Sequence, residues 1–181
     1  MAAAGTVRLR ALLAQRGRGG GGAQPGLPGL GGAGHLVVTP GNETDSTAIE
    51  ADILDLCRRF QVVSAGFDPW QSTQMAQRLR AKGVNMLEFR ATTQNCSSAI
   101  LELDAGLRAG RLRHDGDPVL EWCIGNVVGK PDRRGNLYPA KQRPEQKIDA
   151  AVALMMAIGR AMAEEDGQGD LIDFLRNPII A

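Results

Sequence analysis

The sequence has few aromatic residues and no long hydrophobic segment. Phe, Trp and Tyr together make up 4% of its 181 residues, which argues against a surface that stacks many nucleic-acid bases. No run of 18 apolar residues occurs, so the sequence predicts no membrane-spanning helix. Charged residues make up 23% and hydrophobic residues 43%, which is the balance of a soluble globular protein. The length suits one ordinary domain.

Cysteine and histidine are also scarce. The three cysteines, Cys57, Cys96 and Cys123, are widely spaced and form no Cys-x-x-Cys pair, so a disulfide framework or a structural zinc site is not expected. We expect reduced, buried thiols in a cytoplasmic protein. Two histidines, His35 and His114, are too few for a histidine-based metal cluster. The G-x-x-x-x-G-K-[ST] and G-x-S-x-G motifs are both absent, which excludes a P-loop ATPase and a nucleophile-elbow hydrolase within this sequence.

Acidic residues are absent from positions 1–34, which carry four arginines and 11 of the 23 glycines. Such a segment cannot bury enough apolar surface to offset its ordering entropy, so we expect it to be disordered. We predict an ordered domain over 35–165 and a C-terminal tail over 166–181. Because the net charge after residue 34 is −3, the domain is not a simple electrostatic clamp for DNA.

Hydrophobic periodicity predicts strands that alternate with helices, which indicates an α/β fold with some parallel pairing. Thr47 and Glu50 form a possible capping box for the first helix, whose polar face would carry Glu50. Residues 132–136 predict a hairpin turn. The expected helices are 46–60, 69–82, 97–109, 118–125 and 144–163, and the expected strands are 36–39, 62–67, 84–89 and 127–128.

Asp68 is the first candidate for a chemical role because it directly follows the mostly apolar strand 62–67. In open α/β sheets, ligands collect at the carboxyl ends of strands, where a carboxylate can hold a metal ion. An Asp before Pro69 is also a natural N-cap for the following helix. Position alone favours the cap, although both roles can coexist.

Asp149 is the second candidate and lies early in the last predicted helix. It falls on the shoulder of an apolar stripe that includes Ile148, Val152 and Met155, near the positive end of the helix. The alternative is a first-turn acid that only complements the helix dipole. Glu88, in a predicted strand, is a weaker candidate.

Basic residues are frequent between positions 111 and 147, around the predicted hairpin. The hairpin could contact a phosphate backbone, although a solvated charged loop is the commoner explanation. The basic residues are Arg111, Arg113, Lys130, Arg133, Arg134, Lys141, Arg143 and Lys147.

A series of short motifs, taken in order and spacing, resembles the C-terminal nuclease domain of the large terminase subunit of tailed bacteriophages. The resemblance covers residues 36 to about 163. The motifs are Thr39-Pro40-Gly41-Asn42, Phe67-Asp68-Pro69-Trp70, Arg113-His114, Pro118-Val119-Leu120-Glu121-Trp122, Asn126-Val127-Val128, and Lys147-Ile148-Asp149 with Ala153-Leu154.

The resemblance implies a ribonuclease H-like mixed sheet flanked by helices and a two-metal endonuclease that cuts concatemeric viral DNA during genome packaging. Asp68 matches the second metal-binding acid of the family and Asp149 the third, so both are expected to be catalytic ligands of Mg²⁺ or Mn²⁺. The implied partners are double-stranded DNA, the terminase small subunit and the portal. The implied location is the cytoplasm of the bacterial host.

Two departures from the family pattern shape the expected activity. The first acid of the family lies on a strand upstream of Thr39-Pro40-Gly41-Asn42, whereas residues 1–34 contain no acid; the N-terminal ATPase domain is also absent. We therefore expect a truncated domain that lacks its first strand or strands and cuts DNA poorly. The alternative is a catalytically silent prophage remnant that keeps the fold and binds DNA or a packaging partner weakly. An unrelated small-molecule enzyme would need a pocket that the sequence does not reveal.

Overall fold

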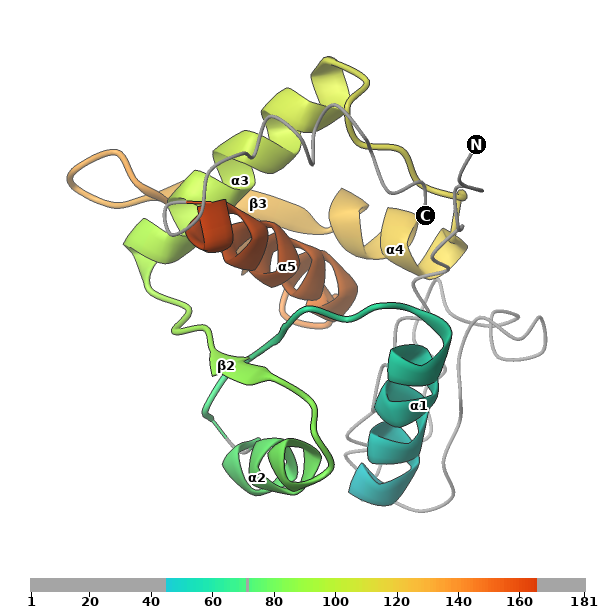
Figure 1. Ribbon diagram of the computed structural model, residues 1–181. Helices are drawn as coiled ribbons and strands as arrows, with labels where there is room; N and C mark the ends of the chain where they lie inside the picture. The colour runs from blue at the N-terminus through green and yellow to red at the C-terminus, as the bar shows by residue number, and fades with distance from the viewer. Residues whose placement is uncertain (1–44, 71, 166–181) are drawn as a thin grey trace.

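The computed structural model describes residues 45–70 and 72–165, and Figure 1 shows how their helices and strands are arranged. The predicted strand 36–39 and the segments 1–34 and 166–181 lie outside the described residues. In chain order, the described elements are α1 (Ser46–Arg59), β1 (Ala65–Phe67), α2 (Thr73–Ala81), β2 (Met86–Glu88), α3 (Thr93–Arg108), α4 (Pro118–Gly125), β3 (Val127–Pro131), β4 (Leu137–Lys141) and α5 (Asp149–Glu165).

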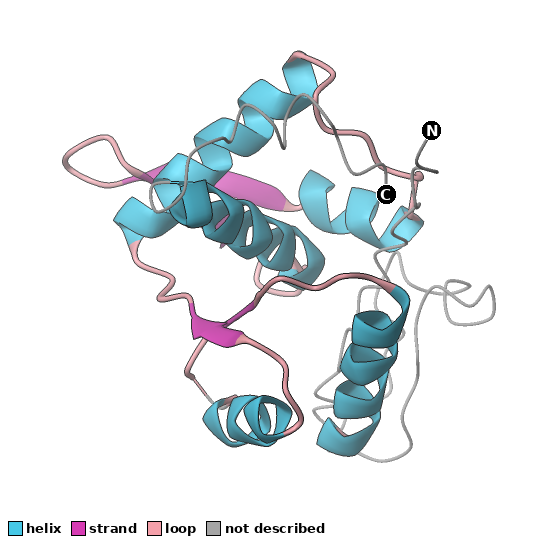
Figure 2. Cartoon of the chain, in the orientation of Figure 1, coloured by secondary structure: helices cyan, strands magenta, loops and turns pink. Residues whose placement is uncertain are grey.

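The described strands form two separate two-stranded sheets (Figure 2). Strands β1 and β2 are parallel, with Ala65 opposite Met86 and Phe67 opposite Glu88. Strands β3 and β4 form an antiparallel hairpin around the predicted turn at 132–136. The α/β class with parallel pairing is therefore confirmed, whereas the described strands do not form the single mixed sheet that was expected.

Helix α5 lies at the centre of the described residues, against α3, α4 and β1 (Figure 1). Met155 packs with Ala99 and Leu103 of α3 in one buried cluster. Helix α5 approaches β1 so closely that a Cβ atom at Gly66 would lie 3.1 Å from Cγ of Arg160. The last helix thus packs on the strand that precedes Asp68.

Strand β1 is shorter than the sequence predicted. Only Ala65–Phe67 is extended and paired, while Val62 and Val63 are 39% and 65% exposed. The predicted strand 62–67 was wrong at Val62 and Val63, because the ladder to β2 begins only where the Ala65 amide donates to the Asn85 carbonyl. An apolar run alone does not show where strand pairing starts.

An arginine covers the outer edge of β2. Because the Asn85 carbonyl accepts from β1, the next carbonyl, that of Met86, faces the other way. Nε and Nη2 of Arg80 donate to that carbonyl oxygen at 2.9 and 2.7 Å. The same guanidinium lies 5.3 Å from the centre of the Phe67 ring. Arg80 therefore ties α2 to both strands.

The starts of three helices differ from the prediction in their caps or in their positions. Asp45 caps α1 by accepting from the amides of Thr47 and Ala48 at 2.9 and 3.2 Å, so the predicted capping box was wrong. Thr92 caps α3 four residues earlier than expected. Helix α5 starts at Asp149 rather than near residue 144, because Arg143 and Gln146 form a separate turn.

Helix α4 forms over the predicted residues, 118–125. Asp117 is its N-cap and accepts hydrogen bonds from the amides of Val119 and Leu120, both at 2.9 Å. Pro118 occupies the first turn, where its missing amide costs nothing. Local sequence signals therefore fix where this helix begins.

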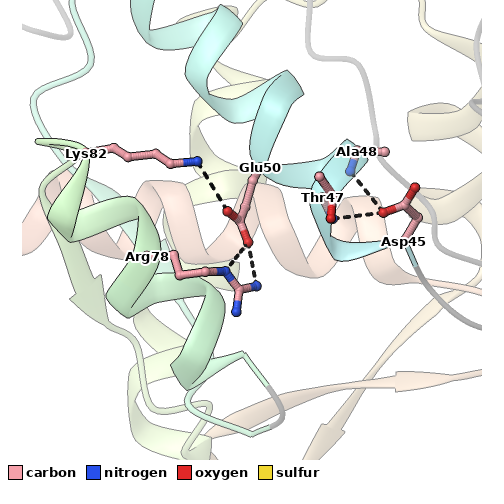
Figure 3. Close-up of polar contacts among 6 residues, drawn as sticks. All are labelled: Asp45, Thr47, Ala48, Glu50, Arg78 and Lys82. Atoms are coloured by element: carbon pink, nitrogen blue, oxygen red, sulfur yellow. Dashed lines mark hydrogen bonds and ion pairs between the residues drawn. The ribbon is translucent and has the colours of Figure 1, made fainter.

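Glu50 is a buried carboxylate rather than part of a solvated helix face. It is 6% exposed and points from α1 toward α2 (Figure 3). Nε and Nη2 of Arg78 each lie 2.5 Å from Oε1 of Glu50, and Nζ of Lys82 lies 3.5 Å from Oε2. The prediction that Glu50 is solvated was wrong because its partners lie on another helix, 28 residues away for Arg78.

This ion-pair cluster makes stability depend on pH. The hydrogen bond from Arg78, assisted by the charges of Arg78 and Lys82, holds the pKa of Glu50 below its ordinary value although burial opposes this. As the pH falls, Glu50 is therefore protonated in the unfolded chain before it is protonated in the folded protein. Its contribution to the free energy of unfolding is present at neutral pH and is lost in the acid range. We expect Glu50→Gln to lower the melting temperature at pH 7 and to change it less near pH 4. Equal losses at both pH values would contradict this role.

The remaining expectations for the described residues concern cysteines and membrane spans. Cys96 and Cys123 are buried free thiols and Cys57 is a half-buried one, so the expected burial is confirmed for the first two and was wrong for Cys57. Burial raises the pKa of the Cys96 thiol. Within 45–70 and 72–165, every helix is too short or too polar to cross a bilayer.

Candidate functional site

Asp68 lies directly after the last residue of β1 and is exposed. Its Oδ1 accepts a hydrogen bond from the amide of Trp70 at 2.9 Å, which forms a tight turn. Helix α2 begins five residues later, and its N-cap is Ser72. The interpretation of Asp68 as the cap of this helix was therefore wrong. The carboxylate stands at the carboxyl end of a parallel strand, where a ligand site was expected.

Glu88 ends the neighbouring strand, at the same edge of the β1–β2 sheet. The register places it opposite Phe67, one residue before Asp68. Its side chain is 47% exposed, and its Oε2 lies 3.8 Å from Nε of Arg90. The weaker sequence candidate thus lies at the same sheet edge as Asp68, because parallel strands carry their carboxyl ends to one side.

Asp149 is the first residue of α5 and is exposed, although both of its neighbours are buried. Ile148 is 7% and Ala150 4% exposed. The predicted position beside an apolar stripe is confirmed. Because the flanking residues are packed into the core, the main chain at Asp149 is held while its carboxylate faces solvent.

Two residues at the end of α4 hold the start of α5. Asn126, which is 6% exposed, donates from Nδ2 to the carbonyl oxygen of Lys147 at 3.1 Å. Cys123 packs with Ala150 and Ala151 in one buried cluster. Sequence reasoning found Asn126 only as part of a motif, because its partner lies 21 residues away.

The pKa of the Cys123 thiol reflects its position beside the start of α5. Burial raises its pKa, hydrogen bonding from the amides of Ala150 and Ala151 opposes the rise, and the charge of Asp149 adds to it. The sulfur therefore lies near the first amides of α5 and within the electrostatic reach of Asp149. A buried thiol with a raised pKa is unsuited to act as a nucleophile.

The close contact between α5 and β1 lies far along the helix from Asp149. Arg160 approaches Gly66, and position 160 lies eleven residues after position 149, which corresponds to about 16 Å along the helix axis. Asp68 lies two residues beyond Gly66. A shared metal site for Asp68 and Asp149 therefore stays a prediction.

The donor chemistry of these residues suits a hard divalent cation. Mg²⁺ takes oxygen ligands and is often held by one or two carboxylates with water and substrate phosphates completing its shell. Across residues 45–70 and 72–165, no group of three or more His, Cys, Asp or Glu side chains could hold a metal ion. The described carboxylates thus fit a weakly held, hydrated ion and do not form a closed protein cage.

The β3–β4 hairpin carries exposed positive charge. Lys130, Arg133 and Arg134 are exposed at or near its turn. Asp132 shapes the turn, since its Oδ1 accepts from the amides of Arg134 and Asn136 at 2.8 and 2.9 Å. The hydrogen bond from Asn136 is the main cause that lowers the pKa of Asp132.

Comparisons with known proteins agree with this arrangement. Residues 33–165 match the family "Terminase large subunit, endonuclease domain". The chain is 38% identical over 144 residues to Protein YmfN of Escherichia coli (strain K12), covering 77% of this chain and 32% of that protein. It is 33% identical over 149 residues to the terminase large subunit of Enterobacteria phage HK97, covering 81% of this chain and 30% of that subunit.

The crystal structure of the HK97 bacteriophage large terminase is similar to the described fold. It has a TM-score of 0.66 and 31% sequence identity, and the match covers 72% of this chain and 28% of that chain. The chain spans about a third of the length of the curated relatives it matches. The family match includes Asp68, Asp149 and the basic hairpin, and on that ground the chain belongs to the family of terminase large-subunit endonuclease domains.

Proposed function

We propose that this chain is a metal-dependent DNA endonuclease domain that cuts concatemeric viral DNA during genome packaging. The observation that carries the proposal is the family match over residues 33–165, which includes both candidate acids. We further propose that the domain has a ribonuclease H-like fold. The parallel β1–β2 pair, the packing of α5 on β1 and the similarity to the HK97 terminase support this.

In the proposed reaction, Asp68 and Asp149 would hold Mg²⁺ or Mn²⁺, which would act on the scissile phosphate. A bound divalent ion lowers the pKa of its water and offsets charge on the leaving oxygen. Water would add to phosphorus, the bond from phosphorus to the 3′ oxygen would break, and a proton from the water would pass through solvent to the 3′ oxygen, which leaves a 5′-phosphate end and a 3′-hydroxyl end. The two carboxylates supply hard, anionic oxygens, and their exposure leaves room for a phosphate between ion and solvent.

The partner that we propose is double-stranded DNA, contacted in part through the β3–β4 hairpin. Arginine and lysine side chains pair with phosphate oxygens without reading bases. The Leu137 amide donates to Oγ of Ser97 at 3.1 Å, which fixes the hairpin to α3. The low aromatic content agrees with backbone contacts rather than base stacking. We propose the terminase small subunit and the portal as protein partners on the family match alone.

Plasmid cleavage tests the proposed function. We expect the full chain to cut supercoiled plasmid slowly with Mn²⁺, more slowly with Mg²⁺, and not at all with EDTA. Mn²⁺ should be the better ion because it binds most sites more tightly, whereas Mg²⁺ requires nearly ideal octahedral geometry. Gel electrophoresis of nicked and linear products measures the rates.

The other outcomes of this experiment are informative. Cutting that persists in EDTA would contradict metal dependence. No cutting with either ion, together with a retained shift of labelled DNA in a native gel, would favour the silent DNA-binding domain.

A further inference from the structure

We infer that Asn126 is a positioning residue for Asp149. The inference rests on the proposed function, because it concerns the metal ligand of that site. Asn126 acts on the main chain from which Asp149 projects, through its hydrogen bond to Lys147.

The hydrogen bonds of Asn126 close both ends of the segment before α5. Its backbone carbonyl accepts from the Gln142 amide at 3.1 Å, and its side-chain amide donates to the Lys147 carbonyl at 3.1 Å. One residue therefore ties the end of β4 to the residue that lies two positions before Asp149. The intervening segment has its own turn between Arg143 and Gln146, so residue 126 sets where that turn is placed.

The surroundings of Asn126 strengthen its hydrogen bond to the Lys147 carbonyl. Asn126 is 6% exposed, so its side chain has little access to solvent, and losing this donor removes the hydrogen-bond partner of the Lys147 carbonyl in a part-buried position. The adjacent turn of α4 adds a second contact, since Cys123 is fully buried against Ala150 and Ala151. The main chain is thus held on both sides of Asp149 by one turn of α4.

A metal ligand on a more mobile backbone binds its ion less tightly, because the entropy that is lost when the ligand becomes ordered opposes binding. Removing residues that orient a ligand typically lowers metal affinity by roughly 10–100-fold. We expect Asn126→Ala to weaken Mn²⁺ binding about 10-fold. Asn126→Ser, which keeps a shorter hydroxyl donor, should fall between the wild type and Asn126→Ala.

The experiment measures free Mn²⁺ by electron paramagnetic resonance during titration of the full chain, without DNA. Leu103→Ala is the control for general destabilisation, since Leu103 is buried in the α3–α5 core. Its cluster is a different one from that of Cys123, Ala150 and Ala151. We expect Leu103→Ala to lower the melting temperature, as loss of a buried leucine does, but to leave Mn²⁺ affinity close to that of the wild type.

Amide hydrogen exchange provides a second readout that needs no metal. We expect faster exchange at Ala150, Ala151 and Val152 in Asn126→Ala than in Leu103→Ala. If Mn²⁺ affinity and these exchange rates are unchanged in both Asn126 variants, the inference is wrong while the proposed function stands. If the wild type itself binds no Mn²⁺, the proposed function fails and the inference falls with it.

Discussion

Asp68→Asn and Asp149→Asn should each lower the rate of metal-dependent DNA cleavage by at least about 100-fold. Residues that only orient a ligand already contribute roughly 10–100-fold, so removing an anionic ligand should cost more. Neither change should unfold the domain. The amide side chain introduced at position 68 would keep an oxygen to accept from the Trp70 amide, and Asp149 is exposed at the start of α5, where loss of charge costs about 0.3–1 kcal/mol. Plasmid cleavage with Mn²⁺ at matched protein concentration measures the effect.

The matched control is Asp52→Asn, which removes the same charge from an exposed position on α1. It should cut at the wild-type rate. Glu88→Gln adds a test of the neighbouring strand end, and a comparable loss there would identify Glu88 as a further ligand. Cleavage that survives both Asp68→Asn and Asp149→Asn would show that the site has been assigned to the wrong residues.

Gly159→Ala should destabilise the domain by roughly 2 kcal/mol. A Cβ atom at this position would lie 2.6 Å from Cε2 and 3.2 Å from Cζ of Phe89, and 3.6 Å from Cβ of Ala99. Phe89 is only 7% exposed, so its ring has little space in which to move. Overpacking of this kind costs about 1–3 kcal/mol or more, which outweighs the gain of about 1 kcal/mol from replacing a helical glycine. Urea denaturation monitored by circular dichroism gives the change in the free energy of unfolding.

Gly125→Ala provides the comparison, because a Cβ atom added to this α4 glycine would meet no neighbouring atom within 4 Å. We expect it to leave stability unchanged or to raise it by up to about 1 kcal/mol. Adding Phe89→Leu to Gly159→Ala should cost less than the sum of the single changes, since the smaller side chain relieves the contact. A stabilised Gly159→Ala variant would disprove this close packing of α5.

The sequence predicted best those features whose signals are local. Helix α4 was placed correctly because Pro118 suits the first turn of a helix. The hairpin was placed correctly because 132–136 is a turn sequence. Glu50 was misinterpreted because a helical wheel describes one helix only, whereas its burial depends on Arg78 of α2. The start of α5 was predicted five residues too early, because the turn formed by Arg143 and Gln146 precedes the helix.

The same difference between local and long-range signals applies to the candidate site. Asp68 and Asp149 were predicted as site residues because order and spacing along the chain resemble a family, and their role stays a prediction. The interactions at the start of α5 were not found, because Asn126 and Cys123 belong to the end of a neighbouring helix and have no spacing rule that links them to Asp149. The distance between Asp68 and Asp149 is a property of how α5 lies on β1, and no local pattern encodes it.

The contact between Arg80 and the Met86 carbonyl bears on how copies of the protein behave at high concentration. A short parallel pair leaves main-chain groups along its outer side that can template the addition of a strand from another molecule. Two guanidinium nitrogens already bond the outward carbonyl of β2, and a positive charge stands where an incoming strand would have to place its own amide. The Met86 carbonyl is therefore already occupied by a residue of α2 and is not free to accept from an incoming strand.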